Sequence, residues 1–348
     1  MLERLLIVGL GSIGRRHVRL AREVLPGAQI VVLRHRSCED LPALGIDRCV
    51  TSLDEALRFR PQAAVIANPA TRHLEVALAL AHAGAQLLVE KPIASTAQGV
   101  SELIDVCRAR GVTLMTGYNL RFLPSLQRFG ELLAQGRVGR VLSVRAEVGQ
   151  YLPSWRPDSD YRHSVSAQAA LGGGVLLELS HEIDYLRWLF GEVEWVSAIQ
   201  RKQSDLEIDV EDTAHLIVGF ARAASEMPVI AALNMDFIRH DTTRTCTVIG
   251  ATGTLRWDAL DGSVAIFEQG ANAWQTLFEH PVQRDDSYRT EWRHFLECIA
   301  GGEAPRTSGE DGLAVLRVIE AARLSASTAA VVHVKNESGG RKSPQAVP

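Results

Sequence analysis

The stretch Gly9-Leu10-Gly11-Ser12-Ile13-Gly14 decides the first half of the fold. It reads Gly-x-Gly-x-x-Gly, it ends an apolar run that begins at Arg4, and it opens a helical pattern that continues to Leu25. A buried strand, a glycine-rich turn and a helix in this order form the context in which the pattern binds a dinucleotide. A glycine-rich turn without a ligand is the weaker interpretation in these surroundings.

Each position of this motif has a physical role in such a site. Gly9 makes the tight turn, Gly11 lets the backbone approach the pyrophosphate, and Gly14 allows the helix to pack closely on the strand. The first amides of the helix, at Ser12 and Ile13, are then directed at the phosphates, together with the positive end of the helix dipole.

Strand-like and helix-like segments alternate through the first third of the chain. Strands are expected at 29–33, 63–67, 86–90 and 113–117, and helices at 53–59, 74–83 and 96–110. Strands that alternate with helices predict a parallel, doubly wound sheet. We therefore predict a dinucleotide-binding α/β domain over residues 1–118.

The end of the second strand bears on the choice between NAD and NADP. A carboxylate about 20 residues after the glycine turn ordinarily binds the adenosine ribose of NAD. Here the strand runs into Arg34, His35, Arg36 and Ser37, with no carboxylate before Glu39. The two arginines and the serine suit a 2′-phosphate through charge-assisted hydrogen bonds. The sequence favours NADP over NAD, and the alternative is a solvated basic loop.

Length and composition set the remaining bounds. With 348 residues, two domains are expected. A net charge of −4 argues against a nucleic-acid partner, and no apolar run reaches the ~20 residues needed to span a membrane. The five cysteines form no Cys-x-x-Cys pair, so no metal site is expected. The start of the chain lacks the features of a secretory signal, and a cytoplasmic location is expected.

Three stretches together resemble the Gfo/Idh/MocA family, the group of glucose–fructose oxidoreductase and inositol dehydrogenase. The first is the glycine turn followed by His17. The second is ANPATRHLEVALALAHAGAQLLVEKPIA, which ends in the Glu90-Lys91-Pro92 signature. The third is GGGVLLELSHEIDYLRWLFG, a glycine-rich entry into a helix with a His, an Asp and a Trp. Their order and spacing fit the family across nearly the whole chain.

The resemblance implies a Rossmann domain followed by an α/β domain with a large, mostly antiparallel, open-faced sheet. The chain agrees, because after about Asn119 the alternation stops and strand-like runs dominate, so we predict a substrate-binding and oligomerisation α/β domain over residues 119–335. The exposed sheet face would leave apolar surface uncovered, so we expect a homo-oligomer, a dimer or tetramer, that pairs these faces. Residues 336–348 are polar and rich in Gly, Ser and Pro, and a disordered tail is expected there.

Lys91 is the first candidate catalytic residue. It follows a buried strand at the carboxyl end, where open α/β sheets place their ligands, and it would orient and polarise the substrate hydroxyl. A surface lysine after a strand is the alternative, which the family signature outweighs. The resemblance also implies cofactor contacts from Ala67, Asn68, His73, Glu90, Lys91 and Asn119.

His181 is the second candidate. We predict a helix over residues 175–190 in which Glu178, His181 and Asp184 are three apart and share a face. The resemblance implies that His181 accepts the substrate proton, with Glu178 or Asp184 assisting. Many relatives carry an Asp four residues before this histidine, where this chain has Leu177. Glu178 is thus either its substitute or unrelated to that role.

The stretch YLPSWRPDSDYRHSVS at residues 151–166 is polar and aromatic. Sugar sites combine an aromatic face with a few placed polar groups, and an ordered surface loop without a catalytic role is the alternative. Beside Lys91 and His181, the predicted substrate contacts are Trp155, Arg156, Asp160, Tyr161 and Arg162.

The sequence as a whole predicts hydride transfer between NAD(P) and a hydroxyl-bearing carbon of a sugar or sugar derivative, with the two arginines of the 151–166 loop favouring a nucleotide-linked or acidic sugar. A cyclitol such as inositol is the alternative substrate. A cofactor-sensing regulatory protein and a glycosidase that uses NAD transiently are alternatives from other classes. The paired presence of Lys91 and His181 argues against the regulatory protein.

Overall fold

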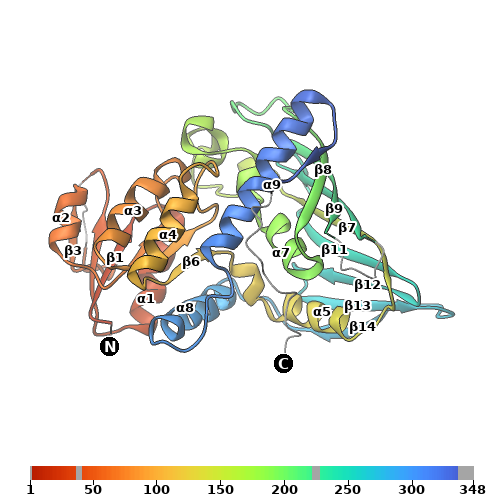
Figure 1. Cartoon of the computed structure of the whole chain (residues 1–348), viewed down its shortest axis with the longest axis horizontal. Coiled ribbons are helices and arrows are strands. Elements are labelled where there is room, and N and C mark those ends of the chain that lie inside the picture. Colours follow the sequence, from red (N-terminus) through yellow and green to blue (C-terminus); the bar gives the residue numbers. More distant parts are fainter. Residues whose placement is uncertain (1, 37–40, 222–227, 336–348) are drawn as a thin grey trace. The chain divides into compact units, whose positions relative to one another are not determined.

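The computed structural model describes residues 2–36, 41–221 and 228–335, and Ser37 of the predicted cofactor set lies outside them. The described chain forms two compact units (Figure 1). Unit 1 comprises residues 1–119 together with 170–172 and 288–316, and unit 2 comprises the rest. Among the described residues, no helix is both long and apolar enough to cross a membrane.

Unit 1 is built on a six-stranded sheet with the order β3-β2-β1-β4-β5-β6, in which every neighbouring pair is parallel. The strands are β1 (Arg4–Val8), β2 (Gln29–Leu33), β3 (Arg48–Val50), β4 (Ala63–Ile66), β5 (Gln86–Glu90) and β6 (Leu114–Gly117). The helices are α1 (Ser12–Val24), α2 (Leu53–Arg58), α3 (His73–His82), α4 (Val100–Arg110) and most of α8 (Asp286–Ile299).

The central strands of this sheet are apolar throughout because helices cover both of their faces. All four residues of β4 are fully buried, as is Leu5–Ile7 of β1. The order of the strands reverses between β1 and β4, which is where doubly wound sheets bind nucleotides at the carboxyl ends of the strands. The predicted doubly wound parallel sheet is confirmed.

Unit 2 contains a nine-stranded sheet with the order β14-β13-β12-β11-β7-β10-β9-β8-β15. Its neighbours are antiparallel except β7 and β10. The strands are β7 (Val141–Gly149), β8 (Val193–Arg201), β9 (Thr213–Phe220), β10 (Ile230–Asp236), β11 (Thr243–Gly250), β12 (Gly253–Asp258), β13 (Ser263–Glu268), β14 (Gln275–Glu279) and β15 (Val332–His333). This confirms the predicted large, mostly antiparallel sheet.

Helices lie on one face of the second sheet. Figure 1 shows α5 (Pro124–Ala134) and α7 (His181–Phe190) on the same side of it. The buried indole of Trp257 on β12 joins them, since its Nε1–H donates to Ser125 Oγ of α5 at 3.0 Å and its ring lies 5.3 Å from that of Tyr185 on α7. α6 (Val175–Glu178) packs on β9 and β10.

The opposite face of this sheet carries exposed apolar side chains. Ile199 of β8, Ile217 of β9 and Ile230 of β10 are 61%, 42% and 44% exposed, and the strand register places all three on one face. Their neighbours along the strands, such as Leu216 and Val218, are buried on the helix side. The side-chain period of two therefore separates a covered face from an open one.

Candidate cofactor and catalytic site

The turn between β1 and α1 is shaped by glycines that the fold itself requires. Gly9 leaves β1 with φ +92°, and a Cβ there would lie 2.7 Å from the carbonyl oxygen of Ala67. A Cβ on Gly14 would lie 2.2 Å from the carbonyl oxygen of Gly9. At Gly11, by contrast, an added Cβ meets no atom within 4 Å. Gly11 thus borders open space, whereas Gly9 and Gly14 are held by backbone contacts.

Polar groups that suit a dinucleotide lie at this turn. Gly11 is the N-cap of α1, which begins at Ser12. It has no side chain that could accept hydrogen bonds from the first backbone amides of the helix, those of Ser12 and Ile13 among them. Uncapped amides and the helix dipole favour a phosphate at this position. Beside the turn, just after β4, Asn68 Oδ1 is buried and has no hydrogen-bond partner in the described part of the chain. The residues present fit a bound dinucleotide.

The end of β2 adjoins the same turn. The Gly9 amide donates to Leu33 O at 2.9 Å, and the next residue, Arg34, donates its own amide to Val50 O at 3.1 Å. Arg34 is half-buried and Arg36 is exposed. Both predicted basic residues therefore follow the strand whose last carbonyl anchors the glycine turn.

A hydrogen-bond chain connects the helix of the glycine motif to the Glu-Lys-Pro turn. Trp292 Nε1–H of α8 donates to His17 Nδ1 at 3.0 Å, so the ring of His17 carries its proton on Nε2. That Nε2–H donates to Glu90 Oε1 at 2.8 Å, and the backbone amide of Lys91 donates to Glu90 Oε2 at 3.2 Å. Figure 1 shows α8 beside α1.

Glu90 carries the negative charge in the hydrogen-bond chain from Trp292 to Lys91. Burial opposes its ionisation, but the hydrogen bond from His17 and the charge of Lys91 outweigh burial and hold the pKa of Glu90 below its usual range. The carboxylate can therefore hold the backbone of Lys91 by a charge-assisted hydrogen bond. Lys91 itself is half-buried at the carboxyl end of β5.

His73 lies between the loops that carry Asn68 and Lys91. Its Nε2 is 2.7 Å from Asn68 O and its Nδ1 is 3.0 Å from Pro92 O. Burial lowers the pKa of His73, and a neutral ring has only one N–H to donate to these two carbonyls. Both ring nitrogens contact backbone, so His73 holds the two loops together. Ala67, which touches the glycine turn, and Asn119, which follows β6, are also buried.

In unit 2, the segment around His181 departs from the predicted single helix. α6 ends at Glu178, and α7 begins at His181. At this junction the amide of Glu182, in the first turn of α7, donates to Leu179 O, a bond across three residues instead of four, so the regular helical hydrogen-bond pattern is interrupted. The prediction of one helix over 175–190 was wrong at residues 179–180. Glu178 consequently lies on a different helix from His181.

Asp184 is engaged by an arginine. The Nε of Arg121 donates to Asp184 Oδ2 at 2.9 Å and its Nη2 donates to Oδ1 at 2.6 Å, and both residues are buried. This bidentate pair fixes α7, whose first residue is the buried His181. A second ion pair that the sequence analysis missed joins the buried Glu182 to Arg244, with Oε1 and Nε 2.8 Å apart. Residue type alone does not indicate such pairs.

The predicted substrate loop is bound to its own unit. Arg162 contacts Asp160 at 2.7 Å and Glu207 at 3.1 Å, and its hydrogen bonds lower the pKa of Asp160 to about 2. Tyr161 Oη accepts a hydrogen bond from the backbone amide of Glu207 at 3.2 Å. Trp155 donates its indole N–H to Gln150 O at 3.2 Å, and Arg156 is exposed.

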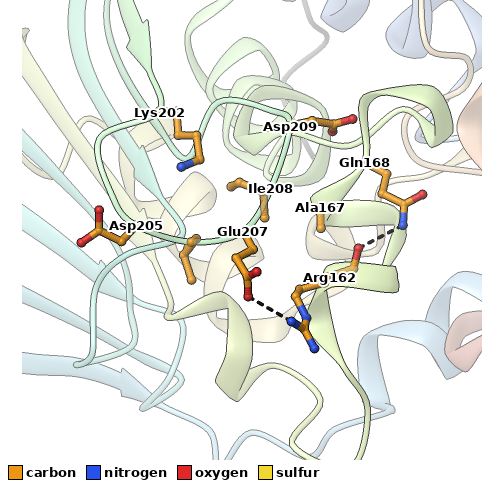
Figure 2. Close-up of a pocket in the computed structure, with 9 residues that line it drawn as sticks. Arg162, Ala167, Gln168, Lys202, Asp205, Glu207, Ile208 and Asp209 are labelled. Carbon is orange, nitrogen blue, oxygen red and sulfur yellow. Dashed lines mark hydrogen bonds and ion pairs between the residues drawn. The ribbon is translucent and has the colours of Figure 1, made fainter.

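Arg162 also lines a pocket of about 530 Å³ between this loop and residues 202–209 (Figure 2). Figure 2 shows its guanidinium directed at Glu207. The other charged lining residues are Lys202, Asp205 and Asp209. Carboxylates outnumber the cations here, so Arg162 contributes hydrogen-bonding polarity and little net positive charge.

The comparisons with known proteins agree with this architecture. The Gfo/Idh/MocA model for an oxidoreductase family NAD-binding Rossmann fold matches residues 4–118, and the model for the C-terminal alpha/beta domain of that family matches residues 130–334. The chain is 27% identical to D-apiose dehydrogenase of Paraburkholderia graminis, over 95% of this chain and 89% of the relative. It is 27% identical to myo-inositol 2-dehydrogenase of Thermotoga maritima, over 92% and 96%.

The solved structures that resemble the chain include levoglucosan dehydrogenase in complex with NADH. The TM-score is 0.84 with 21% identity, and the match covers 96% of this chain and 100% of that one. At this identity the likeness concerns the fold.

Proposed function

Because this chain belongs to the Gfo/Idh/MocA oxidoreductase family, we propose that it transfers a hydride between a nicotinamide dinucleotide and a hydroxyl-bearing carbon of a sugar or sugar derivative. The observation that carries this proposal is the Glu90-Lys91-Pro92 turn, which a buried hydrogen-bond chain ties to the helix of the glycine motif. The named relatives support the substrate class, since they are dehydrogenases of a sugar and of a cyclitol.

Lys91 is assigned the role of holding the reacting hydroxyl. The nicotinamide ring, when bound, supplies or accepts the hydride. The ammonium of Lys91 would donate a hydrogen bond to the substrate oxygen and stabilise the negative charge that develops there. Glu90 contributes by fixing the backbone from which the Lys91 side chain projects.

His181 is assigned the role of proton acceptor for the same hydroxyl. A neutral imidazole is a suitable base near neutral pH. The Arg121–Asp184 pair holds the helix that begins with His181, so Asp184 would act by positioning and not by proton transfer. Glu178, on the preceding short helix, remains a candidate substrate contact in place of the aspartate of other family members.

The substrate that this arrangement favours is an uncharged polyol. Asp160 and Glu207 already neutralise Arg162, which makes this arginine a poor site for a substrate carboxylate or phosphate. Of the two loop arginines that favoured an acidic or nucleotide-linked sugar, Arg162 is thereby engaged within the protein, and we propose a neutral sugar or cyclitol as the first substrate to test. A panel of all four classes, followed by nicotinamide absorbance with NAD and NADP, tests the proposal. If no compound of the panel leads to reduction of the cofactor, the proposal is contradicted.

For the cofactor we propose NADP in preference to NAD. Replacing Arg34 with glutamate is expected to weaken NADP binding by about 10- to 100-fold, because a charge-assisted contact to the 2′-phosphate becomes a repulsion. NAD binding should change by no more than about threefold, well under the 1.4 kcal/mol that a tenfold change represents. Fluorescence titration with NADPH and NADH measures both affinities. Arg110→Glu, at an exposed end of α4, is the matched control. Equal losses for the two cofactors would overturn the preference.

We also propose a homo-oligomer that pairs the open faces of the nine-stranded sheet. Exposed isoleucines on adjacent strands form an apolar surface of the kind that monomers rarely leave in water. Sedimentation equilibrium should give a dimer or tetramer at micromolar concentration. A monomer at that concentration would contradict this assembly.

A further inference from the structure

A second glutamate is buried beside the Glu90 network. Glu291 lies on α8, three residues after Tyr288 and four before Phe295, and Trp292 follows it directly in the chain. Trp292 bonds His17, and the ring of Tyr288 meets that of His17 edge-on, with centroids 6.1 Å apart. Glu291 is 0% exposed.

The two carboxyl groups have opposite surroundings. Glu90 accepts hydrogen bonds from the His17 ring and from the Lys91 amide. Neither oxygen of Glu291 has a hydrogen-bond partner within residues 2–36, 41–221 and 228–335. Burial disfavours a carboxylate that has no hydrogen-bond donor, and a second negative charge nearby disfavours it further. The arrangement therefore favours a single negative charge on the two carboxyl groups, carried by Glu90, which has the hydrogen-bond donors.

The charged groups around Glu291 support this distribution. Burial and the negative charge of Glu90 hold the pKa of Glu291 well above its usual range. On the facing elements, Arg16 lies over the Tyr288 ring at 4.6 Å from its centre, and the amide of Lys91 donates to Glu90. Burial also raises the pKa of Tyr288, so that ring stays neutral. Burial and the charge of Glu90 therefore both favour the protonated form of Glu291.

We propose that Glu291 is a positioning residue for Lys91, acting as the neutral half of a buried acid pair that keeps the Glu90 carboxylate on His17 and on the Lys91 amide. The link to turnover rests on the proposed role of Lys91, whereas the acid pair itself does not. Loss of the Glu291 proton would place a second negative charge against Glu90. The repulsion would displace Glu90 from its two donors and loosen the turn that carries Lys91.

The raised pKa of Glu291 makes the stability of the folded protein depend on pH. Because folding raises the pKa of Glu291, its proton favours the folded state. This contribution is complete at pH values below the unfolded pKa near 4.5 and is lost as the pH rises through the folded pKa. A neutral amide at this position has no proton to lose. The wild-type protein should therefore lose more stability than Glu291→Gln between pH 5 and 9.5.

Thermal melts of the full-length protein without cofactor test this step. The Tm of Glu291→Gln minus that of the wild type should rise by at least about 2–4 °C from pH 5 to pH 9.5. Glu297→Gln, on an exposed position of the same helix, should follow the wild type. In a Glu90→Gln background the gain from Glu291→Gln should shrink, because the repelling charge is gone. Parallel curves for the wild type and Glu291→Gln would overturn the proposal.

The pH dependence of kcat tests the link to Lys91. Glu291→Gln should keep turnover to higher pH than the wild type, whereas Glu291→Ala, which removes the packing as well, should lose at least about tenfold at pH 7. If Glu291→Ala does not fold, the comparison of Glu291→Gln with the wild type decides alone. An unchanged alkaline limb in Glu291→Gln, or a loss at pH 7 as large as that of Glu90→Gln, would overturn the positioning role. Absence of turnover in the wild type would instead contradict the proposed function, and the melts would still decide the acid pair.

Discussion

Replacing Lys91 with methionine is expected to lower kcat by about a thousandfold, while the affinity for the nicotinamide cofactor changes by less than about threefold. Methionine keeps most of the length and the apolar stem of lysine but has no N–H to donate. The variant therefore loses an interaction that strengthens as charge develops on the substrate oxygen, and positioned donors and acid–base groups contribute about 10²- to 10⁴-fold each. The turn and its hydrogen bond to Glu90 use the backbone of Lys91 and should persist.

Steady-state kinetics with the best substrate of the panel and fluorescence titration with the reduced cofactor measure the two quantities separately. Lys335→Met, an exposed lysine in unit 2, is the matched control and should leave both unchanged. If Lys91→Met turns over within tenfold of the wild type, the assignment of Lys91 is wrong. Equal losses in kcat and in cofactor affinity would place Lys91 in cofactor binding instead.

A pair of glycine variants is expected to separate folding from cofactor binding. Gly14→Ala puts a Cβ at 2.2 Å from Gly9 O, and this clash can be relieved only by a shift of the backbone. The variant should therefore be destabilised by about 3 kcal/mol and should also bind the cofactor more weakly. Gly11→Ala meets nothing within 4 Å, so its stability should equal that of the wild type. Its methyl group would, however, project toward the space assigned to the pyrophosphate, and cofactor affinity should fall by at least about tenfold.

Urea unfolding without cofactor and titration with NADH or NADPH give the two quantities for each variant. Gly27→Ala, where an added Cβ also meets no atom, serves as the control for a glycine outside the motif. Unchanged cofactor affinity in Gly11→Ala would mean that the dinucleotide does not approach this turn.

Much of the first unit follows from local pattern. Buried strands such as Ala63–Ile66 are apolar at every position, and the glycine turn has a geometric reason at Gly9 and Gly14 that is independent of any ligand. The second sheet was expected from strand-like runs, and its open face is evident in the alternation that exposes Ile217 and buries Leu216 and Val218.

What the sequence could not reveal are contacts between distant segments. Trp292 bonds His17 across 275 positions, and nothing in the amphipathic pattern of 286–299 indicates that this helix belongs to the first unit. Glu291 occupies an apolar face of that helix, which is the one local sign of unusual chemistry there. Likewise, Asp184 has the spacing of a partner for His181, and only the fold shows that Arg121 engages it.

The break before His181 is a further case. A run of apolar and acidic residues from 175 to 190 satisfies the helical period, because two helices separated by two residues keep nearly the same pattern. The lapse in the ladder at Leu179 depends on hydrogen bonds that residue types do not specify. It places Glu178 and His181 on different helices, whereas Asp184 shares α7 with His181.

Transfer of deuterium from a substrate labelled on its reacting carbon is the most direct test of hydride transfer by this protein. With a sugar or cyclitol carrying deuterium at the oxidised carbon, each turnover should place one deuterium on the nicotinamide ring and produce one equivalent of reduced cofactor, as measured by mass spectrometry and absorbance. Unlabelled cofactor, or product formed without net reduction of cofactor, would contradict direct hydride transfer by this protein.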